Sequence, residues 1–487
     1  APHAIQGIQS KGVIANAKHW VDNSQETNRT TNIANVDERT QMEVYYPPFE
    51  AAVKAGVGSI MCSYNKIAVD GNIFGNSSQW SCENPDTLRR DLKERIGHGK
   101  TNFWVMSDWG AQHHGAPGGY GQGGLDQSMP GGSAKDMKTR LAAGGMTVAD
   151  VDESTIRILT PMFQMGLFES VDANGDLLNK SRSVYANVTS AEHNKIARRL
   201  AGQAMTVLKN EKEVLPLDAK ALKTIAVIGT QAAPGCAVHG GGSGQVFPYY
   251  VSDPLAAIRA RFAGTKNCSK VGGGDHCVLY DDGKDLESIE TTCQHADVGI
   301  VFVMANSGEG SDRATLELTN SWGGKGPTMT PLIQAAAKAC KKTVVVMVSP
   351  GTVLTPWRDQ VDAIIAAIMP GQEYGNAISD VLFGDVASSG RLPFTMPAHA
   401  DQMPFTQEQW PGVPAAVYQQ DKPTSVMGAN GFSNYTEKLL VGHRYYDAHG
   451  LVPAFCFGHG LSLSLFAYTH LTASRAGGVT FTLKNIG

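Results

Sequence analysis

The sequence predicts an α/β protein with two parallel-sheet domains, and three observations support this fold class. The chain of 487 residues is too long for one small core. In the first 170 residues, short apolar runs alternate with helical patterns, which is typical of βα units. A second series of apolar runs separated by helical patterns begins at Thr224. We therefore expect one α/β domain over 1–170, a linker over 171–190 and a second α/β domain over 191–470.

Three predicted strands of the first domain end in polar residues that can take part in chemistry. These residues are Lys18 and His19, then Tyr64, then Asp108. In a (β/α)8 barrel the carboxyl ends of the strands converge on one face, so we expect the four side chains to share one site. Eight βα units need about 250 residues, and this segment ends near residue 170. Only three or four units fit, so either the sheet is small and open or the chain begins in the middle of a barrel.

Helical patterns connect these strands, and we expect helices over 39–56, 84–97 and 147–165. The second of them opens with Asn84 as N-cap and Pro85 in its first turn. In the second domain we expect a helix over 193–210, followed by strands over 224–229, 296–305, 343–349 and 361–369. The last residues, 478–487, alternate like the first strand of a β-sandwich.

Composition argues against two classes of partner. The net charge is −4 and no block of like charges occurs, so neither nucleic acid nor an anionic membrane is an expected partner. No apolar stretch reaches the 18 residues of a membrane span. Six Asn-x-Ser/Thr sequons favour a secreted, N-glycosylated protein. They lie at Asn28, Asn76, Asn179, Asn187, Asn267 and Asn434.

The eight cysteines contain no C-x-x-C pair, so zinc or thioredoxin-like chemistry has little support. Disulfides in an oxidising compartment fit better. Cys62 with Cys82, and Cys268 with Cys277, would each close a short loop, although spacing alone does not settle connectivity and buried free thiols stay an alternative.

The stretch NFWVMSDWG places Asp108 at the end of an apolar run with Trp109 beside it. A buried carboxylate without partners is costly. Asp108 is therefore expected either to belong to a hydrogen-bond network or to serve chemistry. Trp109 offers an aromatic face suited to a sugar ring, and ordinary packing is an equally good explanation for it.

Eight segments, taken in order, resemble glycoside hydrolase family 3, particularly its β-glucosidase branch. Among them are KHWVDNSQE, SDW, GGGSG and SGEG. The segments span 11–29, 59–72, 105–113, 124–132, 240–244, 307–313, 370–397 and 439–466. The resemblance implies part of a (β/α)8-type barrel, a six-stranded α/β sandwich and, from 471 to 487, the start of a fibronectin-III-like domain.

The resemblance also implies a retaining exo-acting β-glucosidase that removes terminal β-D-glucosyl residues from a small carbohydrate substrate. Asp108 matches the nucleophile and Glu309 the acid/base. A retaining glycosidase needs such a pair, one carboxylate ionised and one protonated, and it needs no metal or organic cofactor. Residues matching the sugar pocket are Lys18, His19, Tyr64, Trp109 and Ser243, with Met61 expected nearby.

Two alternatives stay open. A β-xylosidase of the same family is disfavoured because that branch usually departs from the S-D-W sequence at the nucleophile. A non-catalytic carbohydrate-binding paralogue is the second, since the family's N-terminal sugar-binding residues have no counterpart in this chain. We expect a preceding segment or fragment to complete the barrel, because the strand near Val13 would otherwise be an exposed sheet edge. GGGSG lacks both common phosphate-binding patterns, and His113 lacks metal-ligand partners.

Overall fold

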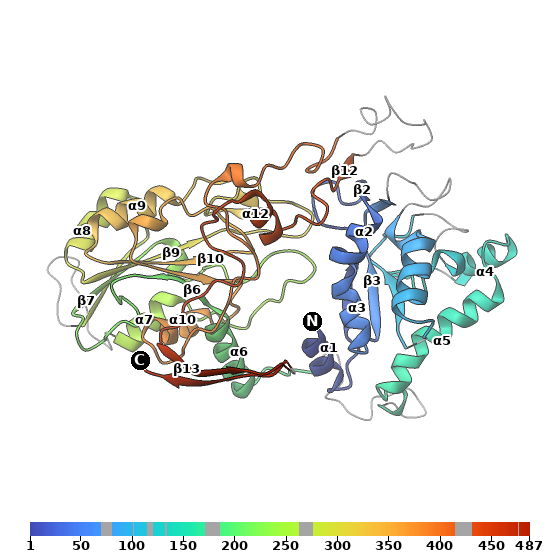
Figure 1. Cartoon of the computed structure of the whole chain (residues 1–487), viewed down its shortest axis with the longest axis horizontal. Coiled ribbons are helices and arrows are strands. Elements are labelled where there is room, and N and C mark those ends of the chain that lie inside the picture. The colour runs from blue at the N-terminus through green and yellow to red at the C-terminus, as the bar shows by residue number, and fades with distance from the viewer. Residues whose placement is uncertain are drawn as a thin grey trace. The chain divides into compact units, whose positions relative to one another are not determined.

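A computed structural model describes residues 1–69, 80–100, 102–113, 120–131, 134–170, 186–262, 276–413, 431–475 and 477–487. The chain forms two compact units. Unit 1 comprises Ala1–Val188 and Phe405–Val441, and unit 2 comprises Thr189–Pro404 and Gly442–Gly487. Each unit is built on parallel β-structure (Figure 1).

Unit 1 contains a three-stranded parallel sheet in the order β1-β3-β5. The strands are β1 (Asn16–Trp20), β3 (Ser59–Cys62) and β5 (Trp104–Ser107). Apolar residues of these strands, Trp20, Ile60, Cys62 and Val105, pack into one core with the flanking helices. This sheet confirms the predicted α/β, barrel-like architecture. Because the strands are parallel, their polar carboxyl ends lie at the same edge.

Helices of unit 1 follow the predicted patterns with local breaks. The predicted helix over 39–56 is divided into α2 (Glu38–Thr40), a π-helical turn (Gln41–Tyr45) and α3 (Pro47–Lys54). Pro47 begins α3 because proline lacks the N–H that a helix interior needs. The segment Asp86–Ile96 forms a π-type helix, and its first N–H groups bond to the Asn84 Oδ1 atom, as expected of an N-cap.

Three further helices complete the described part of unit 1. They are α1 (Pro2–Gln9), α4 (Ala134–Ala142) and α5 (Val148–Gln164). Helix α5 begins with a capping box, in which Thr147 and Asp150 each bond to the backbone N–H of the other. Such a box satisfies two N–H groups that the helix start leaves unpaired.

A second small sheet joins distant parts of the sequence in unit 1. Its strands, in the order β12-β2-β4, are β12 (Phe432–Asn434), β2 (Ile33–Val36) and β4 (Lys66–Val69). Through β12, residues 405–441 belong to unit 1, although the sequence placed them in a continuous second domain.

Strand β12 also corrects one sequon. Asn434 is buried, its Nδ2 donates to Glu408 and its Oδ1 accepts from Asn35. The expectation of a glycan on Asn434 is therefore wrong for the folded chain, because an amide held on both sides is inaccessible. Asn28 and Asn187 are exposed. Asn76, Asn179 and Asn267 lie outside the described residues.

Unit 2 contains the six-stranded sheet that the resemblance implied, in the order β6-β11-β10-β9-β7-β8. Only β6 runs antiparallel to its neighbour. The strands are β6 (Thr206–Asn210), β7 (Thr224–Ile228), β8 (Cys277–Asp281), β9 (Val298–Met304), β10 (Thr343–Val348) and β11 (Ala363–Ala367).

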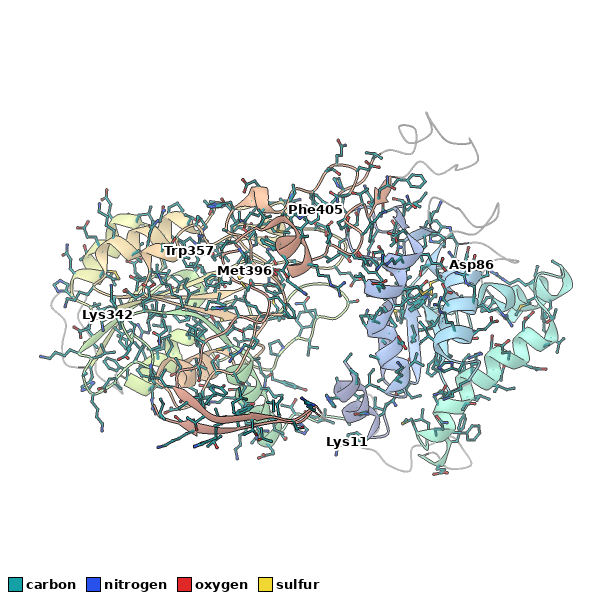
Figure 2. All side chains as sticks on the ribbon, in the orientation of Figure 1. Lys11, Asp86, Lys342, Trp357, Met396 and Phe405 are labelled. Atoms are coloured by element: carbon teal, nitrogen blue, oxygen red, sulfur yellow. A yellow bond between two sulfur atoms is a disulfide. The ribbon has the colours of Figure 1, made fainter. Side chains whose placement is uncertain are left out.

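Helices cover both faces of this sheet. One apolar layer includes residues of α6 (Ala191–Ala204), α7 (Pro254–Phe262) and α10 (Tyr374–Leu382). The opposite layer includes residues of α8 (Leu286–Gln294) and α9 (Thr330–Ala339). Trp357 and Met396, labelled in Figure 2, are buried in this second layer. A short helix, α12 (His443–His449), lies beyond the sheet in sequence.

The predicted helix over 193–210 is wrong in its second half. Helix α6 ends at Ala204, and Thr206–Asn210 forms the edge strand β6. Its register pairs Val207 with Ile365 of β11, and Val207 is fully buried. The β-branched residues of this segment favour a strand, and the continuous amphipathic pattern of the preceding helix concealed the change.

The disulfides partly match expectation. Cys62 and Cys82 are bonded, as predicted, with an S–S distance of 2.01 Å. A second disulfide, Cys293–Cys340, links α8 to the residue after α9, and its separation of 47 residues gave no signal in the sequence. Cys268 lies outside the described residues. Cys236 and Cys456 are free thiols.

The chain ends in an exposed antiparallel hairpin of β13 (Phe466–Ala473) and β14 (Val479–Asn485). The alternating pattern near the C-terminus therefore does form a strand. Its membership of a fibronectin-III-like domain stays a prediction.

Asp22 is a buried carboxyl group three residues beyond His19. Its Oδ2 accepts a 2.6 Å hydrogen bond from Gln41 Nε2. Its Oδ1 and the Gln41 Oε1 are buried without hydrogen-bond partners among the described residues. Burial raises the pKa of Asp22 to about 7, against the lowering effect of the bond from Gln41. The folded chain therefore favours the protonated form.

Replacing Asp22 with Asn is expected to stabilise the protein at neutral and alkaline pH. Because the folded pKa exceeds the unfolded value of 3.8, the contribution of Asp22 is fully present below that value and is lost as the pH rises to about 7. The loss is of the order of 4 kcal/mol or less. Urea unfolding from pH 4 to pH 8 measures the free energy of unfolding, which should rise in Asp22→Asn relative to the wild type as the pH rises. A difference in unfolding free energy that does not change with pH would contradict this.

Candidate active site

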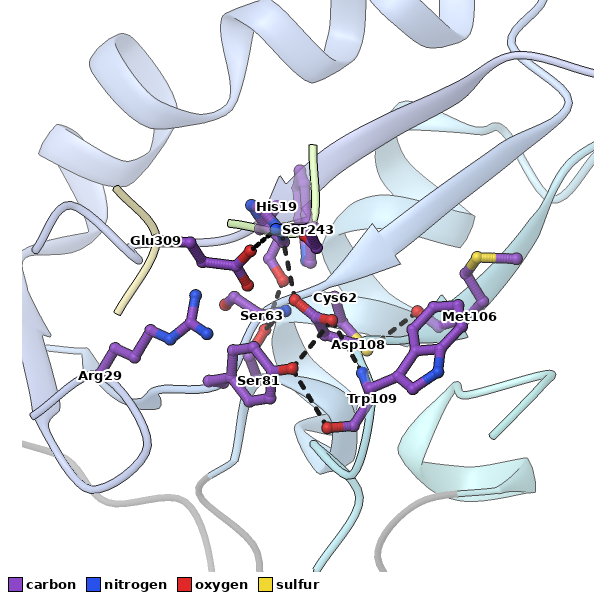
Figure 3. Close-up of polar contacts among 12 residues, drawn as sticks. His19, Arg29, Cys62, Ser63, Ser81, Met106, Asp108, Trp109, Ser243 and Glu309 are labelled. Atoms are coloured by element: carbon purple, nitrogen blue, oxygen red, sulfur yellow. Dashed lines mark hydrogen bonds and ion pairs between the residues drawn. The ribbon is translucent and has the colours of Figure 1, made fainter. Parts of the chain in front are cut away.

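Asp108 follows directly after β5 and is held by hydrogen bonds to one of its oxygens. The Oδ1 atom accepts the Trp109 backbone N–H at 2.8 Å and the Tyr64 hydroxyl at 3.0 Å (Figure 3). The residue is only 6% exposed. The carboxylate thus has a fixed orientation at the carboxyl end of the sheet, as the sequence predicted.

His19 approaches the other oxygen of the same carboxylate. Its Nε2 lies 3.2 Å from the Asp108 Oδ2 (Figure 3). Among the described residues neither atom has an aligned hydrogen-bond partner, so the contact is electrostatic. Burial by itself raises the pKa of Asp108, but the contacts from His19, the Trp109 N–H and the Tyr64 hydroxyl together outweigh it and lower the pKa below the ordinary value. Asp108 is therefore ionised across the neutral range.

The Tyr64 hydroxyl has one proton and two acceptors. The Asp108 Oδ1 lies at 3.0 Å and the Trp109 carbonyl oxygen at 3.1 Å. The orientation of the phenol ring therefore decides whether the hydroxyl donates mainly to the Asp108 Oδ1 or to the Trp109 carbonyl oxygen. Trp109 itself is 53% exposed, so its indole remains available to a ligand.

Lys18 and Met61 lie on neighbouring strands in the same register position, one in β1 and one in β3. Lys18 is exposed, and no ion pair or hydrogen bond to Asp108 is found for it in the described part of unit 1. Met61 is buried. The structure thus brings His19, Tyr64 and Trp109 into contact with Asp108, whereas Lys18 and Met61 are only placed on adjoining strands. Their roles as sugar contacts stay predictions.

Ser81 joins the ends of the two strands that precede the site. Its hydroxyl donates to the Trp20 carbonyl and accepts the backbone N–H groups of Val21 and Ser63, each at 3.2 Å. The adjacent disulfide at Cys82 fixes the same segment to β3. Sequence reasoning missed Ser81, because a single serine after Trp80 carries no recognisable signal.

The segment after Leu125 supports β5 from the other side. The Ser107 N–H donates to the Gln127 carbonyl at 2.9 Å, and the Asp126 Oδ2 accepts the Val105 N–H at 2.8 Å. Asp126 also forms a 2.7 Å buried ion pair with Lys93. Removing one partner of such a pair is destabilising because it leaves an unpaired buried charge. The pair therefore anchors the strand that carries Asp108.

Glu309 belongs to unit 2 and is exposed on a loop that follows β9. Its Oε2 accepts the Ser243 backbone N–H at 2.7 Å (Figure 3), and its own N–H donates to the Gly241 carbonyl at 3.2 Å. A bridge between Gly241 and Gly308 joins the two loops. Ser243 and Glu309, which the sequence singled out separately, are therefore brought together.

Gly242 makes this contact possible. Its φ of +108° is strained for any residue with a side chain, and a Cβ there would lie 2.3 Å from the Glu309 Cβ. If Glu309 has the acid/base role that the sequence predicts, Gly242→Ala should displace this carboxylate and reduce kcat by roughly tenfold or more, since a misplaced catalytic group loses rate steeply. Gly244→Ala, at a glycine with open space around it, is the matched control. Equal activity of the two variants would contradict the expectation.

Among the described residues, no group of three or more His, Cys, Asp and Glu side chains is arranged to hold a metal ion. Within the same residues, no helix has the length and apolarity needed to cross a membrane.

Unit 1 presents the Asp108 carboxylate at the carboxyl edge of a barrel-like parallel sheet, and unit 2 is an α/β sandwich with an exposed glutamate. This is the two-domain arrangement that the sequence resemblance implied. Family comparison agrees with it. Residues 1–160 match the glycosyl hydrolase family 3 N-terminal domain, and residues 205–462 match the family's C-terminal domain. The chain belongs to glycosyl hydrolase family 3.

Individual relatives point the same way. The chain is 34% identical to probable beta-glucosidase L of Aspergillus terreus over 504 residues, covering 96% of this chain and 61% of the relative. It is 32% identical to beta-glucosidase cel3A of Pyricularia oryzae, with 96% and 60% covered. The chain therefore spans about three-fifths of the length of these curated relatives.

Solved structures resemble it over nearly its whole length. The beta-D-glucoside glucohydrolase of Trichoderma reesei superposes with a TM-score of 0.75 at 30% identity, covering 97% of this chain and 63% of that one. Beta-glucosidase 3B of Thermotoga neapolitana, solved with glycerol, gives 0.78 at 26% identity, covering 100% and 67%. These likenesses confirm the predicted fold class of a barrel-like domain followed by an α/β sandwich.

Proposed function

We propose that the protein is a retaining, exo-acting β-glucosidase. The observation that carries this proposal is the environment of Asp108, a carboxylate whose pKa is lowered by its contacts with His19, Trp109 and Tyr64. An ionised carboxylate in a fixed orientation is what a glycosidase nucleophile requires. The relatives named as beta-glucosidases support the choice of substrate.

In the proposed first step, a carboxylate oxygen of Asp108 attacks the anomeric carbon while the bond to the leaving oxygen breaks. That oxygen takes the proton of the Glu309 carboxyl group, and a glucosyl-enzyme ester forms. In the second step, water attacks the same carbon, gives its proton to Glu309 and releases Asp108. Two inversions retain the β configuration.

The residues around Asp108 have separate tasks in this scheme. His19 and the Trp109 N–H stabilise the negative charge before attack, and the Trp109 indole offers a face to the apolar side of the sugar ring. Lys18 and Ser243 are proposed to bind hydroxyl groups of the terminal glucose, and Met61 to pack beside it. The Ser243 N–H orients the acid/base carboxyl group of Glu309.

A substrate panel tests this proposal. The purified protein should hydrolyse 4-nitrophenyl β-glucoside with a kcat/KM at least about tenfold above that for the β-xyloside, since a missing hydroxymethyl group removes contacts of this order. NMR should show the β-anomer of glucose as the first product. A preference for the xyloside would favour a β-xylosidase. No turnover of any glycoside would favour the non-catalytic carbohydrate-binding alternative and overturn the proposal.

We also infer that the protein is secreted and N-glycosylated. The Cys62–Cys82 disulfide and the exposed sequons at Asn28 and Asn187 support this inference. Digestion of the natural protein with a peptide N-glycosidase should lower its mass and convert Asn28 or Asn187 to Asp, while Asn434 stays unmodified. An unchanged mass would contradict the inference.

A further inference from the structure

Arg29 lies against the residue that donates to Asp108. Its Cζ is 4.4 Å from the centroid of the Tyr64 ring, and its side chain extends toward the Asp108 cluster (Figure 3). A guanidinium group at this distance is attracted to the face of an aromatic ring. Arg29 thus contacts Tyr64 through the ring, on a different part of the residue from the hydroxyl that reaches Asp108.

Arg29 is itself held in place. Its Nη1 forms a 3.0 Å ion pair with the Glu26 Oε2, and the Arg29 and Glu26 side chains are only 15% and 27% exposed. The Arg29 backbone N–H also donates to the Glu26 carbonyl at 3.2 Å. The pair closes a turn in which Asn28 has a positive φ and its carbonyl accepts two N–H groups. The guanidinium is therefore tethered rather than free to move away from Tyr64.

We propose that Arg29 is a positioning residue for the reaction, acting on Asp108 through Tyr64; this inference rests on the proposed glucosidase function. Two physical effects act together. The stacked cation fixes the tilt of the Tyr64 ring. That tilt decides whether the hydroxyl donates mainly to the Asp108 Oδ1 or to the Trp109 carbonyl oxygen. The cation also draws electron density from the ring, and this makes the O–H group a stronger donor.

The proposal predicts a change in pH dependence. Within unit 1 the groups that face Asp108 are His19 and Tyr64, with Arg29 and Glu26 behind Tyr64. Because the Tyr64 hydroxyl stabilises the ionised carboxylate, weakening its hydrogen bond raises the pKa of Asp108 toward the ordinary value. The acidic limb of kcat/KM should therefore move to higher pH in Arg29→Met.

A double-mutant cycle with Tyr64→Phe tests the route of the effect. Phe keeps the ring beneath the guanidinium but has no hydroxyl. Arg29→Met should lower kcat/KM by roughly threefold to thirtyfold in the wild-type background and by less than about twofold when Tyr64 is already Phe. Arg29→Lys, which keeps the charge, should recover part of the loss. Arg39→Met is the control, because it removes an arginine from an exposed surface pair with Glu43.

Three outcomes would overturn the proposal. The first is that Arg29→Met leaves kcat/KM and the acidic limb of its pH profile unchanged. The second is that Arg29→Met lowers kcat/KM equally in the wild-type and Tyr64→Phe backgrounds. The third is that Tyr64→Phe alone is as active as the wild type. Thermal unfolding of each variant separates these results from loss of fold. An inactive wild type, or full activity in Asp108→Ala, would instead contradict the underlying glucosidase assignment.

Discussion

Replacing Asp108 with Ala is expected to lower kcat for β-glucosides by about four orders of magnitude or more, equivalent to roughly 5 kcal/mol of transition-state stabilisation. In the proposed mechanism the carboxylate supplies the bonding electrons of the first step, and the other groups in its hydrogen-bond network, the Tyr64 hydroxyl and the Trp109 N–H, are donors that cannot replace it. Initial rates of 4-nitrophenyl β-glucoside hydrolysis measure the loss.

The configuration of the product formed with azide gives a second test of the role of Asp108. In Asp108→Ala the small anion can occupy the space of the lost carboxylate and attack the sugar from the nucleophile's side. A single displacement inverts configuration, so the expected product is the α-glucosyl azide. Asp152→Ala, which removes an exposed acid on α5, is the matched control. A β-glucosyl azide, or equal activity of the two variants, would refute a nucleophilic role for Asp108.

Replacing Glu309 with Ala should reduce the rate most for substrates whose leaving group must be protonated as it departs. Cleavage of cellobiose, whose leaving alcohol must be protonated, should fall about a thousandfold or more, since general acid catalysis contributes roughly 10²- to 10⁴-fold. Glucosides with acidic phenol leaving groups should form the glucosyl-enzyme almost normally and accumulate it. Steady-state rates on both substrate types, with a burst measurement on the phenolic one, check this.

The configuration of the azide product distinguishes the acid/base role from the nucleophile role. In Glu309→Ala, azide attacks the glucosyl-enzyme in place of activated water, so the expected product is the β-glucosyl azide, opposite to that from Asp108→Ala. Glu317→Ala is the control within the same loop region, and it should behave like the wild type. Equal losses on cellobiose and on the activated phenyl glucoside would contradict an acid/base role for Glu309.

The fold was largely readable from the sequence where hydrophobic periodicity is strong. The buried strands β9 and β10 and the capped helix α5 fall where predicted. The failures share a cause: the short strands β6 and β12 pair with partners that are distant in sequence, so nothing next to these segments indicates the pairing. The same holds for the Cys293–Cys340 disulfide.

The sequence predicted which residues meet at the candidate site better than it predicted the contacts between them. Parallel strands bring His19, Tyr64 and Asp108 to one edge, and that follows from topology alone. The direct partners of each oxygen, the cation over the Tyr64 ring and the Ser81 cross-link depend on side-chain geometry that spacing does not encode. Lys18, which the sequence placed at the same site as Asp108, makes no described contact with it; the pKa of Asp108 is lowered by His19, Trp109 and Tyr64.

In the proposed mechanism Asp108 becomes covalently bonded to the sugar. A 2-deoxy-2-fluoro β-glucoside with a good leaving group slows both steps, and with an activated leaving group the first step proceeds while the second stalls. Peptide mass spectrometry of the inactivated protein should place one fluoroglucosyl group on the peptide containing Asp108, and fragmentation should assign it to that side chain. A label on any other residue, or inactivation without a label, would contradict the account.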